Sequence, residues 1–460
     1  MREPGMGLGL DNREKGSGEM FTRKDLVRLL APLIVEQILA VLVGMADVVM
    51  VAAVGEAAVS GVSLVDSISL LIIQMLAALA TGGSVVCAQY LGKKKPEQAC
   101  KAAGQLLLVT TAVSVVIAGV ALIGNRHLLG TIFGSVEEEV MRNAMIYFWI
   151  SALSYPFLAV YNSCAALYRS MGNSKVSMYT SLVMNGLNIA GNAICIFGLH
   201  MGVEGVAIPT LVSRAFAAVL MMYLIQRPAN VIRIHNVKEL RFDGGMIKNI
   251  LRVGVPNGME NAMFQFGKLF LQSLVSSLGT AAIAGYAVAG NLVTFEYLSG
   301  NAIGLGLITI VGQCMGAGEW EQAKKYTKKL VLLNYALLAV ICTLMIAGRG
   351  FLVGIYNLSP GAASTAEAMI LAHSLAMVIW PLAFTLPYSL RASFDAPFTM
   401  YVSVASMWIF RIGFAYLFVV VWKMGVLGIW YGMFIDWVFR ALAFELRFKK
   451  FGKRRVKGLA

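Results

Sequence analysis

Runs of apolar residues alternate along this chain with short polar connections, which hold most of the charged side chains. An apolar run of about 20 residues crosses the roughly 30 Å hydrocarbon core of a bilayer as a helix. The pattern predicts membrane-spanning helices near positions 26–50, 59–86, 102–124, 143–167, 175–198, 203–226, 250–276, 281–312, 327–347, 366–390, 398–421 and 425–446. The sequence therefore predicts an all-α integral membrane protein with twelve transmembrane helices.

The composition supports a membrane protein and excludes a soluble one. The 460 residues are 58% hydrophobic and 13% charged, whereas soluble domains contain about 25% charged residues. The first twenty residues are polar and glycine-rich and lead directly into the first long apolar run. This arrangement does not have the form of a cleavable signal peptide.

The net charge of +14 is distributed unevenly. Basic residues gather in every second connection and in the tail "RFKKFGKRRVK", and the acidic run at 137–139 lies in one of the opposite connections. Positively charged loops stay on the cytoplasmic side, so this pattern predicts that both termini are cytoplasmic. The basic tail indicates contact with anionic membrane lipids, and a nucleic-acid partner is not expected.

The chain contains an internal repeat. Residues 32–101 align without a gap with residues 224 positions later, so that Pro32 matches Pro256 and Glu36 matches Glu260. A later block places Arg169 on Arg391. The repeat predicts two six-helix lobes of parallel topology, related by a pseudo-two-fold axis. Such an arrangement predicts a substrate path between the lobes and alternating access by movement of one lobe against the other. The predicted parts are a flexible tail 1–23, an N-lobe 24–226, a cytoplasmic linker 227–247, a C-lobe 248–447 and a basic tail 448–460.

Ionisable residues within predicted spans are candidates for function, because they are costly in a membrane. They are Glu36, Asp47, Asp66, Arg214, Glu260, Lys268, Glu296, Arg411, Asp436, Arg440 and Glu445. Glu36 and Asp47 are eleven residues apart and share one helix face. Asp436 and Arg440 have the i,i+4 spacing of a pair.

Polar residues also recur along the predicted second and eighth helices. Asp66 and Gln74 lie on one face of the second helix, and Asn291 begins a similar face on the eighth. Such faces predict a wet cavity, whereas hydrogen bonding in a dry helix bundle is the structural alternative.

Catalytic motifs are not found. The sequence contains no HExxH, GxSxG or Walker A motif, so an enzyme is not expected. The four histidines fall in loops or at helix ends, where solvated side chains are expected: His127, His200, His235 and His373. The six cysteines are scattered and predict free thiols.

Several segments resemble the multidrug and toxic compound extrusion (MATE) transporters. They are "MADVVMVAAVGEAAVSGVSL", "QYLGKKKPEQACKAAGQ" with its repeat "QCMGAGEWEQAKKYT", "YRSMGNSK", "GLNIAGNAICIFG" and "GVEGVAIPT". The resemblance implies two six-helix lobes and export of organic cations or xenobiotics in exchange for Na⁺ or H⁺. It further implies a bacterial plasma-membrane protein without a cofactor, and we expect a monomer.

The resemblance also implies a site for the coupling ion. In the prokaryotic branch, the ligands would match Asp47, Asn188, Asn192 and Thr210, which makes these residues a candidate Na⁺ site. Asn192 departs from the pattern, which has Asp there, so the site has one negative charge instead of two. Proton coupling through Asp47 alone is the other option. Arg214, one turn past Thr210, would add a positive charge nearby.

The C-lobe lacks the pattern of the other branch of the family. Glu260 lies one turn before that branch's acid, Trp380 stands where an acid is expected, and Lys268 disfavours a cation site. Glu36 and Glu260 are expected to face each other between the lobes and to gate the inward end. We assign Glu36, Asp66, Gln74, Glu260, Lys268, Asn291 and Arg214 to the cavity, the substrate or gating.

Two alternatives remain open. A lipid-linked oligosaccharide flippase would share the architecture, and Arg214, Lys268 and Arg411 are compatible with its anionic substrate. A purely structural membrane scaffold would tolerate replacement of Asp47 by asparagine.

Overall fold

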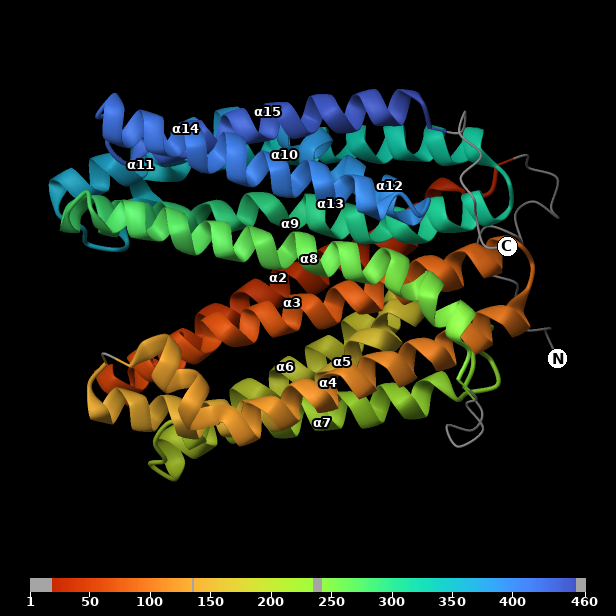
Figure 1. Ribbon diagram of the computed structural model, residues 1–460, viewed down its shortest axis with the longest axis horizontal. Coiled ribbons are helices and arrows are strands. Elements are labelled where there is room, and N and C mark those ends of the chain that lie inside the picture. The colour runs from red at the N-terminus through yellow and green to blue at the C-terminus, as the bar shows by residue number, and fades with distance from the viewer. Residues whose placement is uncertain (1–18, 135, 235–241, 452–460) are drawn as a thin grey trace. The chain divides into compact units, whose positions relative to one another are not determined.

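The computed structural model describes residues 19–134, 136–234 and 242–451, and these residues form helices without a strand (Figure 1). Most of the predicted tails, part of the predicted linker and His235 lie outside the described residues. The predicted all-α architecture is confirmed.

Ten described helices are long and apolar enough to cross a membrane. They are α2 (Arg23–Ala52), α3 (Glu56–Gly92), α4 (Pro96–Phe133), α5 (Glu138–Ser170), α6 (Ser174–Ala193) with its π-helical end Ile194–Gly198, α7 (Glu204–Ile225), α9 (Thr280–Gly316), α10 (Trp320–Gly354), the run Ala396–Val421 that contains α13 (Ala396–Ala405) and α14 (Gly413–Tyr416), and α15 (Leu427–Lys449).

Two further elements account for the remaining predicted spans. α11 (Pro360–Ala376) and the segment Pro381–Ala392, which ends with α12 (Leu386–Ala392), form a pair bent by 67° that together has the length and apolarity of one span. A π-helical turn, Pro381–Thr385, lies between α11 and α12. α8 (Gly244–Ser276) is 33 residues long, and it is outside the apolar set because it carries charged residues such as Glu260 and Lys268.

The helices begin where local sequence favours a start. Thr22 caps α2 by accepting from the Asp25 amide at 3.3 Å, and the Asp25 carboxylate accepts from the Thr22 amide at 2.9 Å. This reciprocal arrangement satisfies two otherwise unpaired amides. α4 and α11 have proline in their first turn, where its missing N–H costs nothing.

The internal repeat is visible in the turns between helices. Gly55 and Gly279, 224 positions apart, both have positive φ directly before α3 and α9. Three further left-handed positions also recur at separations of 222 to 224 residues. These pairs are Lys94 with Gly318, Gly172 with Phe394, and His200 with Lys423. The two halves of the chain therefore have positive φ at equivalent positions, including positions where the residue is not glycine.

The described residues group into two compact units, Met1–Gly258 and Met259–Ala460, with the division inside α8. In the first unit, α5 packs against α3, α4 and α7, and α2 packs against α6. In the second unit, α9 is central and contacts α10, α11 and α12 (Figure 1). Each unit has its own apolar core, as expected for two repeats.

Candidate functional site

Three helices of the first unit bring together the four residues of the predicted ion site. Asp47 lies near the end of α2, Asn188 and Asn192 are one turn apart on α6, and Thr210 lies on α7. The Asn192 amide donates to Asp47 Oδ1 at 2.8 Å, and the Asn188 amide donates to Thr210 Oγ1 at 2.9 Å. The residues therefore form two hydrogen-bonded pairs joined by consecutive turns of α6.

The amide oxygens of this cluster are unusual. Asn188 is 6% exposed and Asn192 is fully buried. The Oδ1 atoms of both are buried without a hydrogen-bond partner in the described part of the chain. An unsatisfied buried acceptor costs about 1–3 kcal/mol. These two amide oxygens, the Asp47 carboxylate and the Thr210 hydroxyl together form an oxygen-rich set of ligands that suits a hard cation.

A pocket of about 470 Å³ adjoins this cluster, because Thr210 belongs to both. Asp66 and Arg214 line the pocket with Tyr147. The Tyr147 hydroxyl donates to Asp66 Oδ1 at 3.3 Å, and Arg214 Nη1 donates to Ser154 Oγ at 2.7 Å. The predicted cavity residues Asp66 and Arg214 thus lie together beside Thr210.

Other predicted cavity residues are not part of this pocket. Gln74 lies partly buried on α3. Asn291 on α9 and Lys268 on α8 have exposed side chains and belong to the second unit. The two residues assigned to gating lie elsewhere, each in an ion pair.

Glu36 and Glu260 each pair with an arginine of their own half of the chain. Glu36 Oε1 lies 3.5 Å from Arg169 Nη1 and Glu260 Oε1 lies 2.8 Å from Arg391 Nη2. The sequence repeat equates these two glutamates and these two arginines. The equivalent pairs link α2 to α5 in the first half and α8 to α12 in the second half. The predicted meeting of Glu36 with Glu260 stays a prediction, and their arginine partners were not anticipated.

The two pairs are expected to differ in strength. Arg391→Gln should lower the free energy of unfolding by roughly 2–3 kcal/mol, because Glu260 is 9% exposed and its Oε2 already lacks a hydrogen-bond partner. Arg169→Gln should cost less, about 1 kcal/mol, because Glu36 keeps a hydrogen bond from Ser177 at 3.0 Å. Thermal unfolding of both variants in one detergent measures the difference. Equal losses of unfolding free energy in the two variants would contradict the expected difference in strength.

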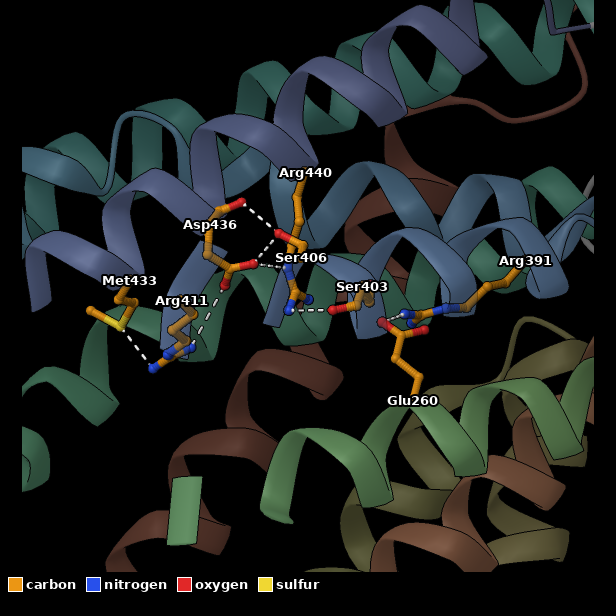
Figure 2. A network of polar contacts seen from close by, with 8 residues as sticks. All are labelled: Glu260, Arg391, Ser403, Ser406, Arg411, Met433, Asp436 and Arg440. Atoms are coloured by element: carbon orange, nitrogen blue, oxygen red, sulfur yellow. Dashed lines mark hydrogen bonds and ion pairs between the residues drawn. The ribbon is translucent and has the colours of Figure 1, made fainter. Parts of the chain in front are cut away.

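A second polar network lies in the second unit, among α15 and the run that contains α13 and α14. Arg440 Nε donates to Asp436 Oδ1 at 2.7 Å, which confirms the predicted i,i+4 pair. The Ser406 hydroxyl also donates to Asp436, and Arg440 Nη2 donates to the Ser403 carbonyl oxygen at 3.0 Å. Figure 2 shows Asp436 at the centre of this network, with Arg440 on one side and Arg411 on the other.

The expectation of a solvated His373 is wrong. His373 on α11 and Glu296 on α9 are fully buried. His373 Nδ1 lies 2.6 Å from Glu296 Oε2, and Nε2 lies 2.6 Å from the Tyr297 hydroxyl. Ser374 donates to the other Glu296 oxygen at 2.5 Å. His373 lies near a helix end, which favoured a solvated side chain, although the intramembrane Glu296 required a partner.

The remaining described histidines, His127 and His200, are exposed as expected. All six cysteines are free.

Comparison with known proteins identifies the architecture. The MatE family model matches residues 32–194 and again 256–417, beginning at Pro32 and Pro256 of the repeat. The chain is 27% identical over 428 residues to "Uncharacterized transporter YisQ" of Bacillus subtilis, covering 90% of this chain and 91% of that protein. It is 25% identical over 433 residues to "Probable multidrug resistance protein NorM" of Thermotoga maritima, covering 91% and 90%.

The fold is likewise similar to that of solved transporters. A MOP superfamily transporter from Pyrococcus furiosus superposes with a TM-score of 0.88 at 20% identity, over 95% of this chain and 96% of that one. MATE structures of this kind contain twelve helices in two lobes, which agrees with the predicted fold class. The family and fold are those of membrane transporters and not of enzymes. With both of its halves matched by the family model, this chain belongs to the MatE family of multidrug and toxic compound extrusion transporters.

Proposed function

We propose that this protein exports small organic cations or other xenobiotics by antiport with H⁺ or Na⁺. Its relative in Thermotoga maritima carries the name of a probable multidrug resistance protein, which supports this substrate class. We further propose a monomer in the bacterial plasma membrane with both termini in the cytoplasm, in agreement with the distribution of basic residues.

The observation that carries the proposal is the oxygen cluster in the first unit. Asp47 provides one carboxylate, and Asn188 and Asn192 each provide a buried amide oxygen without a hydrogen-bond partner. A coupling ion at this point would neutralise Asp47 and satisfy both oxygens. We assign Asp47, Asn188, Asn192 and Thr210 to ion coupling.

The adjoining pocket supplies a physical link between ion and substrate. Thr210 belongs to the cluster and also lines the pocket that contains Asp66. A cationic substrate near Asp66 would therefore be repelled by an ion at Asp47, and binding of one would favour release of the other. Alternation of the two halves would then expose the site to each side of the membrane in turn.

A lipid-linked oligosaccharide flippase is not favoured. The family match is to MatE, and the relative in Thermotoga maritima is named as a probable multidrug resistance protein. The ion-site cluster and its pocket contain two carboxylates, Asp47 and Asp66, against the single guanidinium of Arg214. This balance suits a cationic ligand better than a pyrophosphate.

The proposal is tested in proteoliposomes loaded with a fluorescent organic cation such as ethidium. The proton gradient and the sodium gradient are imposed separately, and we expect that one of them alone drives transport and that no transport occurs without a gradient. The gradient that drives transport identifies the coupling ion. Absence of transport under both gradients, with binding of ethidium also absent, would overturn the proposed substrate class.

A further inference from the structure

Two cationic side chains of the second unit, Arg411 and Lys268, have no close carboxylate of their own among the described residues. Glu260 pairs with Arg391, Glu296 with His373, and Asp436 with Arg440. After this pairing, Arg411 and Lys268 remain without a carboxylate of their own. Around Arg411 and Lys268 the local charge is positive, whereas the cluster and pocket of the first unit contain Asp47 and Asp66 against Arg214 alone.

Arg411 is buried and poorly satisfied. It is 7% exposed, yet its Nε has no hydrogen-bond partner in the described part of the chain. Its Nη2 donates at 2.9 Å to the sulfur of Met433, which is a weak acceptor, and its Nη1 lies 3.9 Å from Asp436 Oδ2. Arg440 shows the normal arrangement, because it donates to Asp436 and to a carbonyl oxygen.

Figure 2 shows the Arg411 guanidinium at the edge of the network, between Met433 and Asp436. A guanidinium has five N–H donors in a planar fork that matches a carboxylate or phosphate. Since Asp436 already accepts from Arg440 and Ser406, it neutralises two arginines with one charge. The Arg411 fork therefore lacks a full anionic partner within the described chain.

Lys268 lies beside Arg411 through a shared aromatic ring. The Lys268 Nζ and the Arg411 Cζ each lie 5.1 Å from the centre of the Phe264 ring. The two positive charges are therefore no more than about 10 Å apart, with the ring between or beneath them. The Lys268 side chain is exposed, so a ligand can reach this side of the cluster.

We propose that Arg411 and Lys268 form a binding site for an anionic group, a carboxylate or a phosphate, with Phe264 packing against the apolar part of the ligand. Arg411 binds two oxygens through its fork, and Lys268 supplies the second charge at the open side. The source of the anion is either a small-molecule ligand or the headgroup of an anionic lipid. The site lies in the second unit and does not depend on the ion-coupling role of Asp47.

The test uses the full chain purified in nanodiscs of phosphatidylcholine. The probes are dansyl-glycine, which carries a carboxylate, and dansyl-glycinamide, its neutral amide, with binding measured by energy transfer from tryptophan. We expect the acid to bind about tenfold or more tightly than the amide. Arg411→Gln should abolish the preference, and Lys268→Gln, at an exposed position, should reduce it several-fold.

Arg447→Gln is the matched control, because Arg447 is an arginine of the same unit that is already paired with Asp395 at 2.6 Å. It should keep the preference for the acid. Equal binding of acid and amide to the wild type would overturn the proposal, and so would a preference that survives in the Arg411→Gln/Lys268→Gln double variant. Arg411→Lys retains the charge in case the glutamine variant does not fold, and it should weaken the preference without abolishing it.

Nanodiscs that contain phosphatidylglycerol separate the two sources of the anion. If a lipid phosphate occupies the site, phosphatidylglycerol will remove the preference for dansyl-glycine in the wild type. If the site takes small-molecule anions, the preference will persist in both membranes. Because the measurement is of binding and not of transport, failure of the antiport proposal would leave its result unchanged.

Discussion

Asp47→Asn is expected to reduce ion-driven efflux by about 100-fold. Asp47 is the single carboxylate of the cluster that also contains Asn188, Asn192 and Thr210. At an effective dielectric constant of about 20, one charge within 4 Å of a cation contributes up to about 4 kcal/mol, and part of this remains through the amide dipole. The measurement is the initial rate of ethidium efflux from proteoliposomes at a fixed ion gradient.

The matched control is Asp25→Asn on the same helix. Asp25 belongs to the cap of α2 and lies far along the chain from the cluster, and asparagine retains an oxygen that can accept from the Thr22 amide. Its efflux should remain close to that of the wild type. Equal efflux in the wild type and in Asp47→Asn would remove Asp47 from the mechanism.

The reciprocal change, Asn192→Asp, tests the same cluster by adding charge. The Asn192 amide nitrogen lies 2.8 Å from Asp47 Oδ1, so aspartate at 192 would place two carboxylates against each other. Such a pair favours a bound cation between the two groups. If Na⁺ is the coupling ion, the Na⁺ concentration for half-maximal efflux should fall about tenfold, and an unchanged Na⁺ dependence would then contradict this interpretation of the site.

The helices could be predicted from the sequence because their causes are local. An apolar run of sufficient length predicts a span wherever it occurs. The same is true of Asp436 and Arg440, whose pairing follows from an i,i+4 spacing on one helix. The left-handed turns at Gly55 and Gly279 follow from the repeat, since equivalent residues adopt equivalent backbone conformations.

Contacts between helices were less accessible to sequence reasoning. Glu260 and Arg391 are separated by 131 positions, and nothing local to either residue identifies the other. The repeat contained a usable signal, because it equated Glu36 with Glu260 and Arg169 with Arg391. Two duplicated acids with two duplicated bases indicate one pairing repeated within each half, whereas the prediction rested on the acids alone.

The assignment of the ion cluster depended on a family resemblance. Periodicity places Asn188 and Asn192 on one face of a helix, but it does not say that Asp47 and Thr210 lie opposite them. The orphaned amide oxygens could be recognised only in three dimensions, because satisfaction of a hydrogen bond depends on every neighbouring element.

The largest loss of stability is expected from His373→Phe. Glu296 and His373 are both fully buried, and the rings of Trp430 and Trp437 lie 5.1 Å and 5.3 Å from the His373 ring. Phenylalanine fills a similar volume but leaves the Glu296 carboxyl group with Ser374 as its remaining hydrogen-bond donor among the described residues. Leaving a buried carboxyl group without its principal hydrogen-bond partner costs about 3–5 kcal/mol.

A double-mutant cycle tests how much the contact between Glu296 and His373 contributes to stability. Glu296→Gln should lose about 1–2 kcal/mol, since the amide can still accept from Ser374 and contact His373. Glu296→Gln/His373→Phe closes the cycle and should be more stable than His373→Phe alone, because no buried carboxyl group is left without its partner. Tryptophan fluorescence during thermal unfolding compares the four proteins. If the double variant instead loses the sum of the separate costs, the pair is not an energetic unit, and His373 contributes to stability through packing against its aromatic neighbours.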